Sequence, residues 1–234
     1  MAMPADNNND LGNNCLYKIS QNISWFLITT LWFNLHFIPL FFLFFFLEAT
    51  LANIVWYLIG IIPLGPAISA LIGSTLRVIE EDDFSDPGKD FRYFHRLNFL
   101  DSFKVWLPYL FLIYIFSVNI NYYFNVASSE YILIGYFFAL LILFSTLLLI
   151  PVFIIQTKFS FRYRDLLRLG LYYFFIKLKL TFGNFFIIFI VIFLLMAISE
   201  WLLFLMPAVL SYIWLLYNYT IVKDVKANFV KEEE

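Results

Sequence analysis

The sequence predicts an all-α fold, a polytopic transmembrane helical bundle with six spans. Three observations predict it. Only 14% of the 234 residues are charged, whereas soluble domains carry about 25%. Six runs of at least 18 residues contain no Asp, Glu, Lys or Arg. The fifteen Lys and Arg residues all fall outside these runs, in alternate connections. A net charge of -2 leaves no basic field to attract nucleic acid.

Each uncharged run is long enough to cross a bilayer, because a hydrocarbon core of about 30 Å needs roughly 17–25 helical residues. The predicted spans are 23–47, 51–76, 105–129, 131–157, 182–199 and 201–222. Only Glu200 separates the last two spans. Unbroken, they would form a helix of about 60 Å, at a rise of about 1.5 Å per residue. We therefore expect a tight turn between Ser199 and Pro207.

The distribution of basic residues predicts the orientation. One precedes the first span, five lie between spans two and three, six between spans four and five, and three follow span six. The other connections carry Glu48, Glu130 and Glu200. Basic residues mark the cytoplasmic side, so we expect a multi-pass cell-membrane protein with both termini in the cytoplasm. The predicted parts are a disordered tail within 1–22, one transmembrane domain over 23–222 with cytoplasmic loops at about 77–104 and 158–180, and a tail over 223–234.

The second span contains a predicted helix break at Pro63, Gly65 and Pro66. Two prolines remove backbone donors and clash with the preceding turn, so a helix does not run through them. If the break lies at membrane depth, the helix that starts near Ala67 would point its positive end into a candidate pocket for an anionic group. If it lies at the outer surface, it is a turn before the span.

Beyond the break, Gly65, Ser69 and Gly73 recur every four residues. Such a ladder lets another helix approach closely, and close packing drives helix association in lipid. We predict a helix-packing surface here. Its partner is either another span of the same chain or another protein.

The first basic loop contains a predicted helix that begins at Asp86 and Pro87, since Asp is a favourable N-cap and Pro suits the first helical position. On this helix Arg92, His95 and Arg96 share one side. This cationic side is a candidate contact with a partner protein. The alternative is that the helix lies on the anionic headgroups of the lipid bilayer.

No pattern for catalysis, cofactor binding or metal ligation occurs in the chain. The spans contain no Asp, Glu, Lys or Arg, which counts against an ion-coupled transporter. The polar residues singled out inside them are Asn34, His36, Asn53, Ser145, Thr146, Asn184, Ser211 and Asn218. We therefore expect a protein that is not an enzyme and carries no cofactor.

Gly65-Pro66-Ala67, a small-residue helix ending at Arg77, and then Asp90-Phe91, Asn98-Phe99 and Ser102 follow in this order. This order and spacing resemble the YesL-like family of small bacterial membrane proteins, which share a domain of unknown function. The resemblance implies a Gram-positive bacterium and an accessory role in carbohydrate uptake, with the permease or ATPase subunits of an ABC importer as partners. The chain lacks the Glu-Ala-Ala motif typical of the permease itself.

Two functions remain open at this point. The first is a non-enzymatic accessory component of a carbohydrate ABC uptake system. The second is a small-solute transporter or channel with its pocket at the broken second helix. A pocket that holds polar groups at membrane depth would favour the transporter, and a closed bundle with exposed cytoplasmic helices would favour the accessory component.

Overall fold

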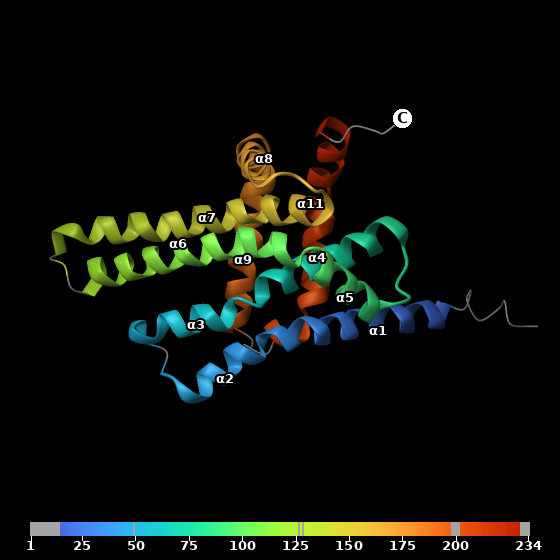
Figure 1. The fold of residues 1–234 in the computed structure, drawn as a ribbon, viewed down its shortest axis with the longest axis horizontal. Helices are drawn as coiled ribbons and strands as arrows, with labels where there is room; N and C mark the ends of the chain where they lie inside the picture. Colours follow the sequence, from blue (N-terminus) through green and yellow to red (C-terminus); the bar gives the residue numbers. More distant parts are fainter. Residues whose placement is uncertain (1–14, 49, 126, 128, 198–201, 230–234) are drawn as a thin grey trace, which may run out of the picture.

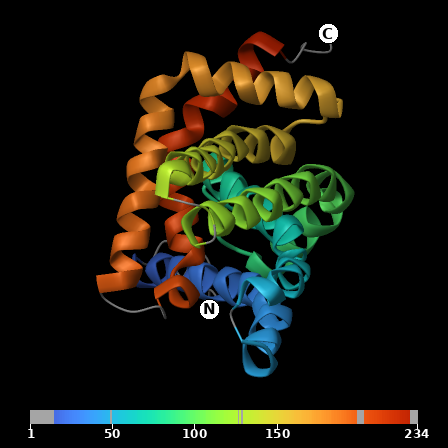
Figure 2. The same cartoon turned by 90° about the vertical axis from the view of Figure 1, so that its left-hand side faces the viewer.

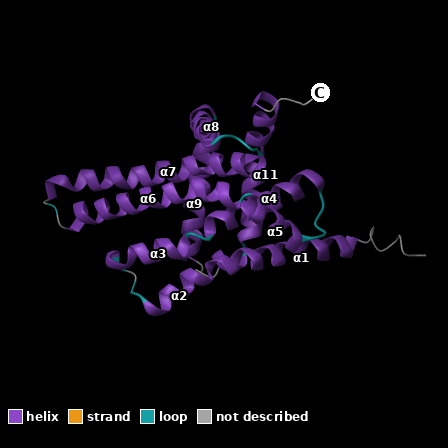
Figure 3. Cartoon of the chain, viewed as in Figure 1, coloured by secondary structure: helices purple, strands orange, loops and turns teal. Residues whose placement is uncertain are grey.

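The computed structural model describes residues 15–48, 50–125, 127, 129–197 and 202–229, and among these residues it is all-helical, without a β-strand (Figures 1 and 3). The α-helices are α1 (Cys15–Asn34), α2 (Ile38–Phe46), α3 (Ile54–Ile61), α4 (Leu64–Glu81), α5 (Pro87–Leu97), α6 (Phe99–Asn125), α7 (Ile132–Lys158), α8 (Tyr163–Ile176), α9 (Leu178–Ala197), α10 (Leu202–Leu205) and α11 (Pro207–Phe229). Short 3-10 turns η2 (Leu35–Phe37), η3 (Leu51–Asn53) and η4 (Ser129–Tyr131) precede α2, α3 and α7. Residues 1–14 of the predicted N-terminal part (1–22), residues 230–234 of the predicted C-terminal tail (223–234) and Ser199 in the predicted turn lie outside the described residues.

Several of these helices fit a membrane protein. Four described stretches are long and apolar enough to cross a bilayer, and the number rises to five if the bent pair of α3 and α4 forms one span. The four are Tyr17–Phe46, Phe99–Asn125, Ile132–Lys158 and Leu178–Ala197. Six spans are not confirmed: α11 is not among these stretches, and its last turns carry Lys223, Asp224 and Lys226.

The predicted break differs from the observed one in position. The helix ends at Ile61 and resumes at Leu64, with a bend of 42°, which is either a broken span or a re-entrant loop. Gly65 and Pro66 therefore lie inside the first turn of α4. Proline is tolerated there because the first amides of a helix have no partner within it.

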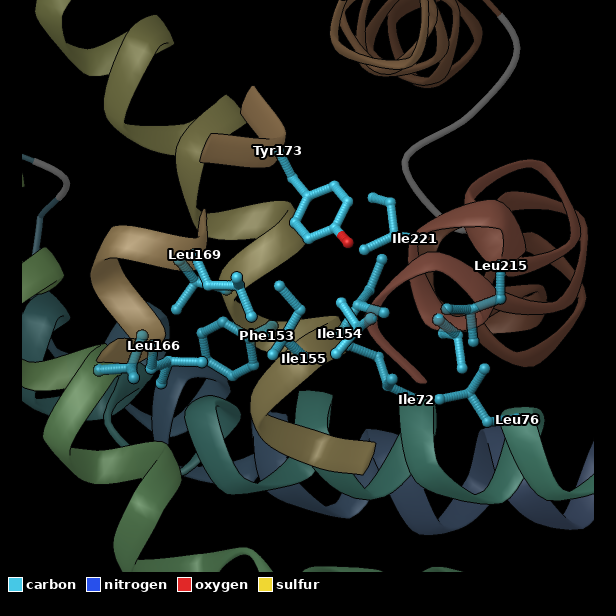
Figure 4. Packing of buried hydrophobic residues seen from close by; sticks show 14 of the residues in the cluster. Ile72, Leu76, Phe153, Ile154, Ile155, Leu166, Leu169, Tyr173, Leu215 and Ile221 are labelled. Carbon is cyan, nitrogen blue, oxygen red and sulfur yellow. The ribbon is translucent and has the colours of Figure 1, made fainter. Parts of the chain in front are cut away.

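Helix α4 is the centre of the fold, and most of its residues are buried. It contacts α1, α5, α6, α7 and α11. Figure 4 shows Ile72 and Leu76 of α4 in one cluster with Ile154 and Ile155 of α7 and Leu215 of α11. Small residues along the rest of α4 make this possible, because they let several helices approach one axis.

Helices α6 and α7 pack side by side as a long hairpin, whereas α9 and α11 run across this direction (Figures 1 and 2). A reciprocal amide pair joins α9 to α11: Asn184 and Asn218 exchange two hydrogen bonds of 2.9 Å. The indole of Trp214 donates a third bond to Asn184, at 3.0 Å. Polar contacts of this kind hold helices together in lipid, where apolar contact alone gives little preference.

The acidic stretch after α4 sets the start of α5. Asp82 adopts a left-handed conformation, with φ of 52°, and ends α4. Helix α5 begins at Pro87, as predicted, but the side chain of Asp86 forms no cap hydrogen bond. Instead its carboxylate pairs with the Lys89 ammonium at 3.1 Å, and its backbone carbonyl accepts the amides of Lys89 and Asp90.

Candidate functional site on helices α4 and α5

The helix break is filled by a side chain of α6. The indole of Trp106 donates a hydrogen bond of 3.2 Å to the carbonyl of Ile61, at the end of α3. The same side chain lies over Gly65, where an added Cβ would come within 2.6 Å of it. Gly65, Pro66 and Ala67 are buried, and Pro63 is half-buried. The break therefore forms a packed joint between α3, α4 and α6.

The small-residue ladder meets two helices of the same chain. Gly65 faces Trp106, as described, and the Ser69 and Ser102 hydroxyls of α4 and α6 share a hydrogen bond of 2.7 Å. Gly73 faces Phe94 of α5. Each of the three residues thus contacts one side chain of another helix, two from α6 and one from α5.

At the end of α4 lies a charged joint that fixes α5. Arg77 forms an ion pair with the buried carboxylate of Asp90 and a second one with Glu81 at 2.9 Å. Burial raises the pKa of Asp90 above its usual range, and the nearby Arg77 guanidinium opposes this shift. Beside this joint, Lys158 of α7 pairs with Glu80.

A polar cavity of about 230 Å³ lies at this charged joint. Its lining includes Arg77, Glu80, Tyr93, Thr157 and Lys158. The charged members of the lining are already paired with one another or with Asp90 and Glu81. The cavity therefore offers paired charges and hydroxyls rather than a free charge to a ligand.

The exposed side of α5 forms a basic-aromatic face, which we define as Lys89, Arg92, Tyr93, Arg96 and Leu97. These residues line an open hollow of about 480 Å³. Tyr93 and Leu97 are 61% and 57% exposed, so the face combines basic and apolar side chains. The predicted group of Arg92, His95 and Arg96 is split: the two arginines are exposed on this face, whereas His95 is half-buried.

His95 meets the other histidine of the chain. Its Nε2 atom lies 3.2 Å from Nε2 of His36, in the 3-10 turn after α1. Burial lowers the pKa of His95, and His36 and Arg96 lower it further. This contact was not predicted from the sequence. The sequence did contain a signal for it. Trp32 and His36 lie four residues apart and thus on one side of a helix, and Gly88, Phe91 and His95 lie on one side of α5.

The eight polar residues singled out in the predicted spans form hydrogen bonds within the chain, although buried oxygens of Thr29, Asn34 and Gln156 have no hydrogen-bond partner among the described residues. Each of the eight forms at least one hydrogen bond: Asn34 with Phe204, His36 with Trp32 and His95, Asn53 with Glu48, Ser145 with Ile142, Thr146 with Tyr109 and Ile142, Asn184 with Asn218 and Trp214, and Ser211 with Thr75. A cavity of about 300 Å³ between α4, α9 and α11 is lined by apolar side chains, apart from Ser211 and the indole of Trp214. Its lining is suited to a hydrocarbon chain and not to a polar solute.

No family model, curated protein or solved structure matches this chain. The resemblance to the YesL-like family therefore remains a prediction from the order of its motifs.

Proposed function

We propose that the chain is a non-enzymatic membrane protein that serves as an accessory subunit of a carbohydrate ABC importer and contacts the permease or ATPase through the basic-aromatic face of α5. The observation that carries this proposal is the contrast between a filled interior and an exposed α5. Trp106 occupies the break, whereas Arg92, Tyr93, Arg96 and Leu97 are exposed. The sugar importer as partner comes from the resemblance alone.

The same contrast disfavours the alternative, a transporter with its pocket at the break. Transport through the bundle requires polar groups that line a cavity at membrane depth. Here each of the eight polar residues singled out in the spans bonds to another group of the chain, and the break is packed. Purified protein in liposomes provides the test: uptake of a solute down its gradient would replace the accessory proposal with the transporter.

We further propose that the basic connections face the cytoplasm, as in the predicted six-span topology with both termini inside. Figure 1 shows the turn of the α6–α7 hairpin at the left, whereas α5 lies right of centre and the C-terminal end of α11 lies at the upper right. The hydrocarbon core of a bilayer is about 30 Å thick. Helix α6, at about 1.5 Å per residue, is roughly 40 Å long and has length to spare.

Cysteine labelling tests the topology. In a protein without Cys15, single cysteines at Ser128 and Ser160 should react differently with an impermeant thiol reagent in intact cells. We expect Ser128→Cys to label and Ser160→Cys to label only after lysis. Equal labelling of the two in intact cells would refute the proposed orientation.

Charge reversal on α5 tests the docking face. Arg92→Glu with Arg96→Glu should weaken partner binding by about 1–3 kcal/mol if the charge pairs are partly desolvated, and it should leave the fold intact because exposed charges contribute little to stability. The matched control is Arg164→Glu with Arg168→Glu, two exposed arginines at the same spacing on α8. The measurements are sugar uptake and pull-down of importer subunits. The accessory proposal fails if deletion of the protein leaves uptake unchanged and no importer subunit co-purifies.

A further inference from the structure

Helix α5 is held against α1 by a contact, here termed the α1–α5 seam, that contains both histidines of the chain. On the α1 side are Trp32 and His36. On the α5 side, Gly88 lets the helix approach closely, since an added Cβ there would lie 2.9 Å from Nε1 of Trp32. Phe91 stacks on Trp32 with ring centroids 6.5 Å apart, and it is buried. One turn further, His95 reaches His36 with ring centroids 4.9 Å apart.

The hydrogen bonds assign the proton positions in this pair. Nδ1 of His36 lies 3.0 Å from the carbonyl oxygen of Trp32. A carbonyl only accepts, so Nδ1 must carry the proton, and Nε2 of neutral His36 is an acceptor. The Nε2···Nε2 distance of 3.2 Å then requires His95 to donate from its Nε2.

This geometry accepts one proton but not two. A first proton on either ring leaves one hydrogen bond between the two Nε2 atoms in place, because the other ring can still present a lone pair there. A second proton fills that lone pair, and both rings would then direct an N–H group at the other across 3.2 Å. The hydrogen bond would be lost, and two positive charges would face each other in a half-buried contact.

The charged groups around the pair add to this repulsion. On α5, Arg96 acts on His95 through its charge, and Arg92 lies 5.3 Å from the Trp32 ring centroid. The α1–α2 stretch supplies no other charge between Lys18 and Glu48. The acidic groups on neighbouring elements are paired elsewhere: Asp90 with Arg77 of α4, and Asp101 with Lys104 on α6. Neither of these two carboxylates is therefore available to compensate the charge of a second proton on the histidine pair.

We propose that His36 and His95 form a proton-operated switch that holds α5 against α1 while at least one imidazole is neutral and releases it when both are protonated. This switch deepens the proposed function, because α5 carries the basic-aromatic face that would meet a partner. A metal ion is a weaker interpretation of the same pair. Among the described residues no third His, Cys, Asp or Glu joins it, and Arg96 repels a cation.

The first test observes the two protons directly. Because the chain contains only two histidines, ring-15N-histidine labelling of the full-length protein in lipid nanodiscs gives signals from this pair alone. We expect two separate titration steps, with that of His95 below the ordinary histidine pKa of about 6.5. Both rings titrating together in one step near that value would overturn the proposal.

The second test observes the helix. Amide-exchange protection of residues 87–97, corrected for the intrinsic pH dependence of exchange, should fall roughly tenfold or more between about pH 7.5 and about pH 5, since one pKa unit of coupling corresponds to a tenfold change. His95→Gln retains a neutral donor toward His36 and should show no such fall. Constant protection in the wild type, or an equal fall in the variant, would overturn the switch. Neither test involves a partner protein. A negative result would therefore refute the switch alone, whereas the uptake and pull-down experiments test the accessory role.

Discussion

Gly73 provides the sharpest test of how α5 is seated on α4. A Cβ added there would lie 2.5 Å from Cγ and Cδ1 of Phe94 and 2.9 Å from its Cβ. Carbon atoms in contact lie about 3.5–4.0 Å apart, so Phe94 would have to retreat by roughly 1 Å. The contact involves the base of the ring, and rotation of the side chain does not relieve it. Helix α5 would have to move as a unit, against the buried Phe91 and the Arg77–Asp90 pair.

The expected magnitude follows from two opposing effects. Overpacking costs about 1–3 kcal/mol, whereas replacing a helical glycine with alanine gains up to about 1 kcal/mol of helix propensity. Gly73→Ala should therefore lower the free energy of unfolding by about 0–2 kcal/mol. Gly73→Leu adds three more carbons at the same point and should lower it by about 1–3 kcal/mol or more. The assay is equilibrium unfolding in mixed micelles by a denaturing detergent.

Two further variants make this test specific. Ala139→Leu enlarges an exposed position in the middle of α7 and should change the free energy of unfolding little. Phe94→Ala in the Gly73→Leu background should restore part of the loss, with a coupling energy of about 0.5–3 kcal/mol for residues in contact. If Gly73→Leu is as stable as wild type, Phe94 does not pack on this rung, and the proposed seating of α5 is wrong.

Three other outcomes are expected. Trp106→Phe leaves the carbonyl at the helix break without its donor and should cost about 1–3 kcal/mol in the same unfolding assay, whereas Trp56→Phe at an exposed indole should cost little; equal losses would contradict the filled joint. Asn218→Ala removes the partner of Asn184 and should cost about 0.6–2 kcal/mol, with no loss expected if α9 is held by apolar contact alone. The pKa of His95 is lowered in the folded state, so below about pH 6.5 the folded state binds fewer protons than the unfolded state. The stability that this residue contributes is therefore complete above that pH and decreases as the pH falls through the lowered pKa. A free energy of unfolding that stays constant from about pH 7.5 to about pH 5, compared with His95→Gln, would contradict this sign.

The sequence was sufficient to predict most of the long apolar helices, but not α8, which lies in the predicted loop 158–180, and not the directions of the helices. The uncharged runs predicted α7 to within one residue and α6 to within six residues at each end, because an apolar segment of that length is helical in lipid. They gave no information on the crossing of α9 and α11 over the α6–α7 hairpin. A helix that is apolar on all sides, such as α7 or α9, does not indicate which side packs against protein.

The start of α5 was predictable because it depends on local chemistry at Asp86 and Pro87. The histidine contact was not, since His36 and His95 lie 59 residues apart and their meeting depends on how α5 folds back over α1. The same limit applies to the ladder on α4. Spacing identified Gly65, Ser69 and Gly73 as a close-packing side, but it did not identify Trp106, Ser102 and Phe94 as the side chains that occupy it.

The polar residues of the spans hold the tertiary information that the apolar residues lack. In lipid, contact between two apolar helices brings no hydrophobic gain, so hydrogen bonds between helices help to fix the position of α9. In the most hydrophobic window of α9 only 6% of the residues are buried, yet the single buried residue described for it, Asn184, bonds to both Asn218 and Trp214. The polar residues Asn184 and Asn218, together with the indole of Trp214, therefore fix the position of α9 against α11.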